Sequence, residues 1–397
     1  LRGLHSCRAR KKALQRNPKE QQMKKNEVEK EVTVACAGSY KSKKARWNDW
    51  KWQIKNRINT LEEISKYVHL TKEEKKGLVL TERLAFAITP YFLSLIDPFD
   101  PNCPIRKQCI PTSSEGVATE FDYNDPCAEE KDSPVPGLVH RYPDRVLLLV
   151  TDECATYCRH CTRRRTTGHA KHVMTSKMLE KVIKYLTDNP AIRDVIVSGG
   201  DPLTLSDEKL EMILSSLKKV PTVEVIRIGT RVPIFLPMRI SESLVTMLKK
   251  YNPVWMSIHI NHPKEITADV KKALARLADA GIVMGSQTVL LKGINDTSEA
   301  MKKLCLEVMK NRVRPYYIYQ CDPAIGTSHF RASIEKGIDI VSKLRGFISG
   351  YAVPTYVIDA PGGGGKIPIS PKYVVEKQGK KWTLKNFRDK HYEYIET

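Results

Sequence analysis

From about residue 145 onward, the sequence alternates between short runs of β-branched and aliphatic residues and longer segments with helical periodicity. Six strands that alternate with helices predict parallel βα units and therefore an α/β fold. Because active sites in such arrays gather at the carboxyl ends of the strands, residues that follow a strand are the first candidates for function. The predicted strands lie at 146–151, 195–198, 223–228, 255–260, 282–291 and 313–319, and the predicted helices at 176–187, 207–219, 241–251, 266–280 and 299–310.

Composition and apolar periodicity along the sequence divide the chain into four regions. Residues 1–45 form a basic tail with little apolar periodicity, which we expect to be poorly ordered. Residues 46–139 begin with helical spacing at Trp47 and continue, after several prolines near residue 100, as an irregular wrapping segment. The βα array occupies 140–360, and a glycine-rich loop and C-terminal extension occupy 361–397.

The charge of the chain is concentrated near its beginning. The net charge is +21, and 17 of the 66 Lys and Arg residues but only 5 of the 45 acids lie within the first 58 residues. Since a basic tail attracts any polyanion, this charge is weak evidence for nucleic acid as a partner. No apolar run approaches the roughly 18 residues of a membrane span, and no secretory segment is recognisable, so we expect a cytoplasmic protein with no membrane contact.

Three cysteines follow the first predicted strand at the spacing C-x3-C-x2-C, namely Cys154, Cys158 and Cys161. Three thiols on a tight loop can hold three irons of a 4Fe-4S cluster and leave the fourth iron open. A structural zinc site is the alternative, but it needs a fourth ligand, and the nearest candidate, His160, lies inside the loop. The spacing resembles that of the radical S-adenosylmethionine (SAM) superfamily. That resemblance implies a partial (β/α)6 barrel and SAM bound to the open iron.

A glycine pair follows the second predicted strand, in the run Ser198, Gly199, Gly200, Asp201. Glycines there allow backbone groups to approach a ligand closely, although alone the run also fits a simple turn before a helix. In the radical SAM superfamily the corresponding segment binds the amino group of SAM, so the resemblance implies that these four residues contact SAM.

A lysine, Lys366, follows Pro361 and the four glycines of residues 362–365. A nucleotide-binding P-loop needs a hydroxyl residue after the lysine, whereas Ile367 follows here. A lysine presented from a flexible loop can instead form a Schiff base with pyridoxal phosphate (PLP). A simple flexible linker is the alternative interpretation.

Several blocks together resemble the lysine 2,3-aminomutase family, over a stretch from about 47 to about 390. The blocks lie at 140–149, 158–165, 227–231, 259–263, 313–322 and 361–366. The resemblance implies that Lys366 is the PLP lysine and that Arg141, Tyr142 and Arg145 hold PLP and its phosphate. It also implies that Asp201, His259 and Gln287 line the SAM side of the site.

The same resemblance bears on the substrate. Arg163 matches the residue that binds the substrate carboxylate, and Asp322 and Asp359 match the carboxylates that hold the ε-ammonium of lysine. Two neighbouring carboxylates repel each other unless a cation lies between them, as a lysine side chain would. Glutamate 2,3-aminomutase, or another amino-acid 2,3-aminomutase, remains the alternative. A radical SAM enzyme acting on RNA is less favoured, because it gives Lys366 and the two aspartates no role.

The activity implied by the resemblance is an isomerase reaction. L-Lysine and β-lysine would interconvert by a 5′-deoxyadenosyl radical mechanism, with the substrate bound as a PLP aldimine. The implied partners are an electron donor such as flavodoxin or ferredoxin and further copies of the chain in a homo-oligomer. Some family members join subunits through zinc, but Thr297 replaces the barrel cysteine and no cysteine follows Cys321, so we do not predict that zinc site.

Overall fold

The computed structural model describes residues 44–80, 85–169 and 173–397. The basic tail predicted over 1–45 therefore lies, apart from its last two residues, outside the described residues. The chain divides into two compact units between Trp52 and Gln53. In the described part of the first unit, α3 (Lys44–Trp47) and the start of α4 (Trp50–Lys55) carry Trp47 and Trp52, whose ring centroids lie 6.4 Å apart.

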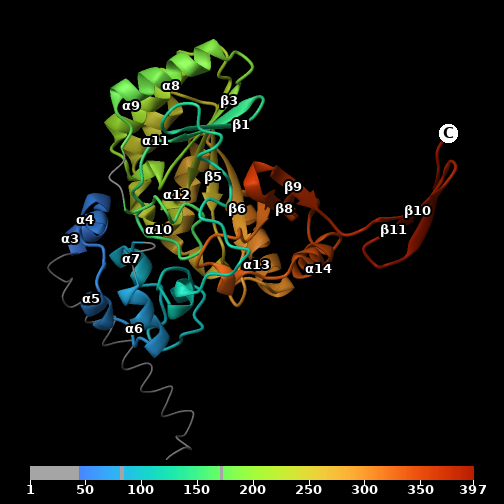
Figure 1. Cartoon of the computed structure of the whole chain (residues 1–397), viewed down its shortest axis with the longest axis horizontal. Coiled ribbons are helices and arrows are strands. Elements are labelled where there is room, and N and C mark those ends of the chain that lie inside the picture. Colours follow the sequence, from blue (N-terminus) through green and yellow to red (C-terminus); the bar gives the residue numbers. More distant parts are fainter. Residues whose placement is uncertain (1–43, 81–84, 170–172) are drawn as a thin grey trace, which may run out of the picture. The chain divides into compact units, whose positions relative to one another are not determined.

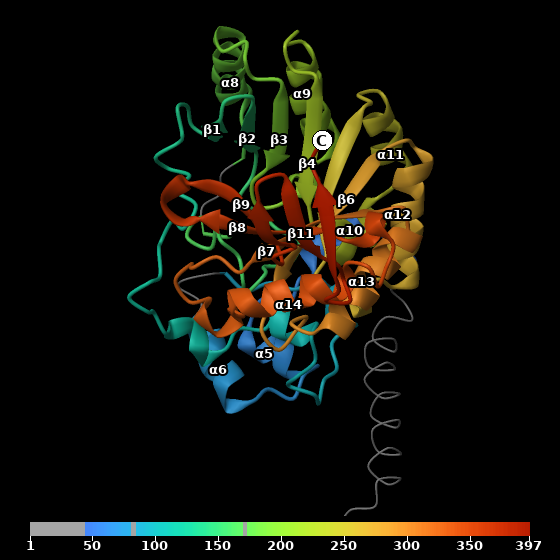
Figure 2. The ribbon, with the colours of Figure 1, turned by 90° about the vertical axis from the view of Figure 1, so that its right-hand side faces the viewer.

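The second unit is built on a nine-stranded sheet in which the strands lie in the order of the sequence (Figures 1 and 2). Strands β2 to β8 are parallel, while β1 and β9 pair antiparallel at the two ends. The strands are β1 (Leu138–Tyr142), β2 (Arg145–Leu149), β3 (Asp194–Ser198), β4 (Val225–Thr230), β5 (Val254–His259), β6 (Val283–Leu290), β7 (Arg314–Gln320), β8 (Thr355–Ala360) and β9 (Gly365–Ile369).

The predicted α/β barrel fold is confirmed, and all six predicted strands form, as β2 to β7. The structure adds a seventh parallel strand, β8, which the sequence analysis did not predict. That run leads directly into the glycine-rich loop, so its C-terminal flank did not distinguish it from the extension.

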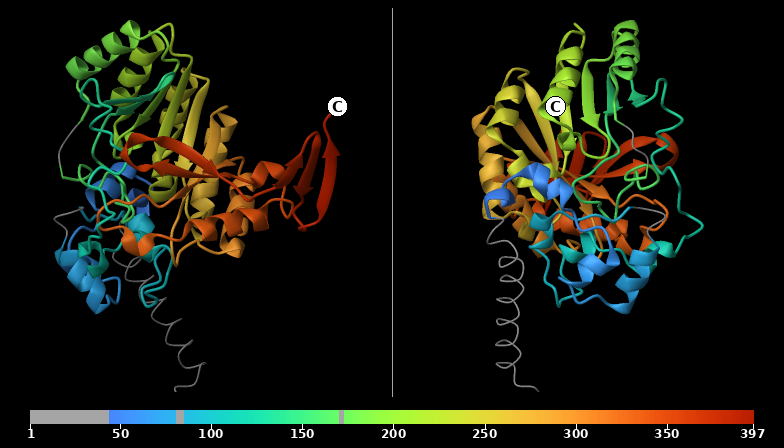
Figure 3. Two further views of the ribbon diagram at one scale, coloured as in Figure 1. Left: turned by 45° about the vertical axis from the view of Figure 1, so that its right-hand side comes forward. Right: turned by 90° about the vertical axis from the view of Figure 1, so that its left-hand side faces the viewer.

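Six helices form one layer along the parallel strands (Figure 3). Each begins after a Ser or Thr whose hydroxyl accepts a hydrogen bond from a backbone amide of the first turn, which satisfies a donor that the helix leaves free. One of these caps is Thr297. The helices are α8 (Ser176–Asp188), α9 (Asp207–Lys218), α11 (Glu242–Lys249), α12 (Ala268–Asp279), α13 (Ser298–Lys310) and α14 (Ile334–Leu344).

Strand alternation separates the core from the functional face. In β5, Val254, Met256 and Ile258 are buried, whereas the residues between them are more exposed. Because successive side chains point to opposite faces, Ser257 and His259 lie on the face away from the buried set. The inner face of the sheet is therefore available for polar site residues.

Shorter elements complete the second unit. The predicted N-terminal helical region is confirmed in type, but it consists of short helices separated by turns, and the region boundaries at 46, 140 and 361 stay predictions.

No helix in the described ranges is long and apolar enough to cross a membrane. The short helices are α5 (Leu61–Ser65), α6 (Lys72–Val79), α7 (Pro90–Leu93) and α10 (Val232–Phe235). The 3-10 turns are η2 (Arg106–Gln108), η3 (Ser113–Gly116), η4 (Pro202–Thr204), η5 (Pro237–Arg239), η6 (Pro263–Glu265), η7 (Ser328–Phe330), η8 (Gly350–Ala352) and η9 (Pro361–Gly363). A separate antiparallel sheet contains β10 (Val374–Gln378), β11 (Lys381–Lys385) and β12 (His391–Ile395).

Gly337 provides a test of the packing between α14 and β8. A Cβ atom at this position would lie 2.3 Å from Cζ of Tyr356, which is 1% exposed and is held by a hydrogen bond from its hydroxyl to Gln320. We therefore expect Gly337→Ala to destabilise the protein by about 1–3 kcal/mol, as overpacking does, despite the better helix propensity of alanine. Urea denaturation followed by circular dichroism measures this. Gly350→Ala, with no atom within 4 Å of the new Cβ, is the control and should be near neutral.

Candidate active site

The three predicted cluster cysteines lie together on the loop that follows β2. All three thiols are free, and Cys154, Cys158 and Cys161 interact electrostatically with one another. Burial, followed for Cys154 by the charge of Asp201, raises the pKa of the Cys154 thiol, and burial also raises that of Cys158. Thiols in this environment stay protonated until a metal displaces the proton, which agrees with a metal-binding role and not with a free nucleophile.

Two buried nitrogen atoms near this loop fit a 4Fe-4S cluster. His160 Nδ1 and Arg231 Nε have no hydrogen-bond partner among the described residues. An unpaired buried donor costs about 1–3 kcal/mol, so such atoms indicate a missing acceptor. Three thiols with an open fourth position, surrounded by donors, match the needs of a cluster with inorganic sulfides better than those of a closed zinc site.

The glycine pair after β3 lies against the start of the cysteine loop. Gly200 donates from its backbone amide to Thr151 O, and Gly199 has a φ of +132° with a Cβ position only 2.3 Å from the same oxygen. Ser198, the last residue of β3, accepts from the amide of Val150. A Cβ atom at either glycine would collide with the backbone of residues 151–153, so the glycines allow the end of β3 to pack directly against the start of the cysteine loop.

Asp201 has a different position from the other predicted SAM residues. Its carboxylate is 4% exposed and accepts hydrogen bonds from Thr230 Oγ1 at 2.7 Å and from the backbone amides of Arg231, Val232 and Leu203. Burial raises its pKa to about 6, although these donors act in the opposite direction. The carboxylate thus joins the ends of β3 and β4, and its contacts within the protein are already satisfied.

His259 and Gln287 are register partners on β5 and β6. His259 donates from Nε2 to Asn261 Oδ1 at 2.9 Å, and its ring lies 5.3 Å from the ring of His160. Burial and the neighbouring Arg231 lower the pKa of His259 to about 3. The imidazole is therefore neutral at physiological pH and serves as a hydrogen-bonding group, not as a cation.

The predicted PLP residues come together although they lie at opposite ends of the sheet. Lys366 on β9 donates from its backbone amide to Tyr142 Oη at 2.9 Å, and Tyr142 lies on β1. Arg145 lies over the Tyr142 ring at 3.8 Å, and Arg141 Nε donates to Asp132 at 2.8 Å. The first and last strands thus meet, and the lysine, the tyrosine and two guanidinium groups fit a phosphate-bearing aldehyde.

Arg163 is engaged by an acid that the sequence analysis did not identify. Its Nε and Nη2 donate to Glu129 at 2.7–3.0 Å, and its Nη1 lies 3.4 Å from Gly199 O. The bidentate edge of the guanidinium is therefore occupied in this structure. Only the Nη1 side faces the glycine segment after β3.

Asp322 and Asp359 do come together, as predicted. One oxygen from each carboxylate and Cys127 Sγ all lie within 4.8 Å of one another. Burial, and next the charge of Asp359, raise the pKa of Asp322 to about 7. Lys366 Nζ lies 3.1 Å from Asp359 Oδ1, so an ammonium group already occupies the edge of this acidic cluster.

Sequence reasoning missed Cys127, Glu129 and Arg231. The first two lie in the irregular segment before β1, where no periodicity indicates which side chains face the barrel. Arg231 follows β4 directly, and the rule that functional residues follow strands would have identified it.

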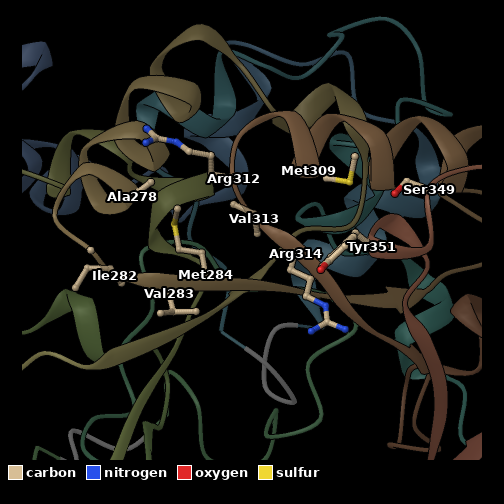
Figure 4. A pocket seen from close by; sticks show the side chains of 11 residues that line it. Ala278, Ile282, Val283, Met284, Met309, Arg312, Val313, Arg314, Ser349 and Tyr351 are labelled. Atoms are coloured by element: carbon tan, nitrogen blue, oxygen red, sulfur yellow. The ribbon is translucent and has the colours of Figure 1, made fainter.

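A separate hollow lies at the other end of the strands and contains none of the predicted site residues. It is lined by Val283, Met284, Met309, Arg312 and Tyr351, among others, near the amino-terminal ends of β6 and β7 (Figure 4). Since ligands of parallel βα arrays bind at the carboxyl ends, this hollow is not the candidate active site.

Comparison with known proteins agrees with this geometry. Residues 148–305 match the model of the radical SAM superfamily, and residues 341–397 match the model named lysine-2,3-aminomutase. The chain is 55% identical over 344 residues to the L-lysine 2,3-aminomutase of Clostridium subterminale, a match that covers 86% of this chain and 83% of that protein. It is 56% identical over 342 residues to the L-lysine 2,3-aminomutase of Acetoanaerobium sticklandii, with the same coverage of both chains. It is 46% identical over 332 residues to the glutamate 2,3-aminomutase of Clostridioides difficile, covering 83% of this chain and 78% of that one. The chain therefore belongs to the lysine 2,3-aminomutase family of the radical SAM superfamily.

Proposed function

We propose that this protein is an L-lysine 2,3-aminomutase, an isomerase that interconverts L-lysine and β-lysine. The observation that carries the choice of substrate is the meeting of Asp322 and Asp359 beside Lys366. Two partly buried carboxylates this close repel each other unless a cation lies beside them. Lys366 Nζ supplies that cation here, and once Lys366 is engaged with PLP the ε-ammonium of lysine would take its place. A second carboxylate, as glutamate carries, would be repelled at the same place.

The radical-generating half of the site is assigned to the loops after β2 and β3. When bound, the 4Fe-4S cluster and SAM would supply the radical chemistry of the reaction. Cys154, Cys158 and Cys161 hold the cluster, and the glycine segment presents backbone groups to SAM. His259 and Gln287 line the same side from β5 and β6, while Asp201 fixes the ends of β3 and β4 beneath it.

The other half of the site is assigned to the β1–β2 and β8–β9 hairpins. When bound, PLP supplies a carbonyl carbon for the substrate amine and a conjugated system that spreads unpaired electron density. Lys366 holds it covalently, and Arg141, Tyr142 and Arg145 orient its ring and phosphate. Glu129 holds Arg163 in place at 2.7–3.0 Å, so that its Nη1 side is directed toward the substrate carboxylate.

The partners and location follow from the same proposal. The chemistry needs one electron for each priming event, which we assign to a flavodoxin or ferredoxin. We further propose a homo-oligomer in the cytoplasm, the reducing compartment in which free thiols of this kind persist.

Lysine binding should depend on pH through Asp322. The carboxyl group has a pKa of about 7 in the absence of substrate, so it is neutral below that pH and charged above it. We expect the dissociation constant of L-lysine to rise as pH falls from 8 to 6, because the neutral acid attracts an ammonium group less strongly. Isothermal titration calorimetry across this range measures the effect. Asp322→Asn should bind weakly with little pH dependence, and an equally steep profile in that variant would contradict the assignment.

Product analysis tests the substrate. After anaerobic reconstitution with iron, sulfide, PLP and SAM, the protein should convert L-lysine to β-lysine and leave L-glutamate unchanged. Asp359→Asn should lower kcat/KM for lysine about 10-fold or more, since a hydrogen bond to a charged group contributes about 1.5–3 kcal/mol. Asp339→Asn, which removes an exposed carboxylate paired with Lys343, is the matched control and should retain activity. Conversion of glutamate alone would keep the reaction class and refute lysine as the substrate.

Retention of PLP tests Lys366. Lys366→Arg keeps a positive charge near Asp359 but cannot form the covalent bond, so we expect the variant to lose PLP on gel filtration while the wild-type protein retains it. The PLP content per chain, measured after alkaline release, gives the result. Lys372→Arg changes an exposed lysine six residues away and should retain PLP. Equal PLP content in both variants would refute the role of Lys366.

A further inference from the structure

Arg231 is a buried guanidinium that contacts one of the cluster cysteines. It follows β4, is 5% exposed, and donates from Nη1 to Cys158 Sγ at 2.8 Å. Its other terminal nitrogen, Nη2, donates to Glu265 at 2.8 Å and to Gln108. The ring of Phe235 lies 4.4 Å from the guanidinium carbon. Contacts with three other segments and with its own helix α10 therefore fix the position of this side chain.

The partner acid is as deeply buried as the arginine. Glu265 is fully buried, accepts from Gln108 Nε2 at 2.8 Å through Oε1, and accepts from the amide of Asn261 at 2.8 Å through Oε2. Moving both members of an ion pair out of water costs several kcal/mol per ion, and apolar residues of similar volume serve stability as well or better. A buried pair beside a cofactor loop therefore needs a reason besides stability.

The unpaired Nε of Arg231 indicates what this second reason is. Arg231 Nε is buried without a hydrogen-bond partner in the described part of the chain. A guanidinium donates through five N–H groups, so after the bonds to Cys158, Glu265 and Gln108 a further acceptor is expected at this position. The sulfides of an iron–sulfur cluster are acceptors of this kind.

We propose that Arg231 is a positioning residue that raises the reduction potential of the 4Fe-4S cluster by donating a hydrogen bond to the ligand sulfur of Cys158 and by placing a fixed positive charge beside it. Reduction adds one electron and makes the cluster more negative, so donors to its sulfurs and nearby cations stabilise the reduced form. Glu265 limits this effect, because its negative charge partly offsets that of the guanidinium. The inference rests on the proposed function only in requiring that the cluster be present.

The proposal predicts that substitutions of Arg231 and of Glu265 shift the midpoint potential of the cluster in opposite directions. A purely structural role for the pair predicts no such opposition. Arg231→Gln removes the positive charge and should make the midpoint potential more negative. Glu265→Gln keeps Arg231 and an acceptor for it but removes the negative charge, and should make the midpoint potential less negative. Arg231→Lys keeps the charge and should lie between the wild type and Arg231→Gln.

The experiment is a potentiometric titration of the anaerobically reconstituted full chain, with dithionite as reductant and electron paramagnetic resonance of the reduced cluster as readout. PLP and lysine are omitted, so the result is independent of the proposed aminomutase activity, which is assayed separately on the wild type. Arg227→Gln is the matched control. Arg227 lies on the same strand and pairs with Asp194 at 2.9 Å, so its removal should leave the potential unchanged.

Shifts of opposite sign in Arg231→Gln and Glu265→Gln support the proposal. A wild-type potential in Arg231→Gln with full iron content, or shifts of the same sign in both variants, would overturn it. If Arg231→Gln binds no iron, Glu265→Gln decides alone, and an unchanged or more negative potential there overturns the proposal. Loss of iron from both of these variants and from Arg231→Lys would also overturn it, in favour of a purely structural role.

Discussion

The site depends on the parallel alignment of strands β2 to β8. Each connection between two parallel strands runs back along the sheet, so that the next strand begins at the same edge as the one before it. The carboxyl ends of all these strands therefore lie together at the opposite edge. The cysteine loop, the glycine pair, Arg231, His259 and Asp322 each follow or end a different strand of this set. Residues separated by more than 150 positions in the sequence are brought to one edge by strand direction alone, and the antiparallel strands β1 and β9 then close the two ends around it.

Buried charge is the second organising feature. Glu115 accepts from both Arg159 and Arg164, Glu129 accepts from Arg163, and Glu265 accepts from Arg231. In these pairs four guanidinium groups meet three carboxylates, and the buried Asp201 adds a fourth acid near Cys154. The buried charges around the cysteine loop are therefore largely paired within the protein.

The fold was largely predictable from the sequence, and the site in part. Short β-rich runs located six strands, and helical periodicity located five helices between them. The cofactors followed from the resemblance of the cysteine spacing and of the glycine-rich lysine loop to known families. Glu129 and Cys127 were not predictable, because they lie in an irregular segment whose path depends on tertiary contacts. The hydrogen bonds of Asp201 were not predictable either, because its four donors within the protein come together only through the spatial arrangement of β3 and β4.

The β8–β9 hairpin makes Asp359 and Lys366 cross-strand neighbours. In the proposed function, one end of the substrate is bound at Asp359 and the other end reacts at the cofactor that Lys366 anchors, so the hairpin register would set the distance between these two points. A slip of one residue would turn Lys366 to the opposite face of the sheet and remove the anchor, not merely shift it. On that proposal the backbone pairing of β8 and β9 would limit the length of the substrate, whereas side-chain substitutions would change the charge that is recognised.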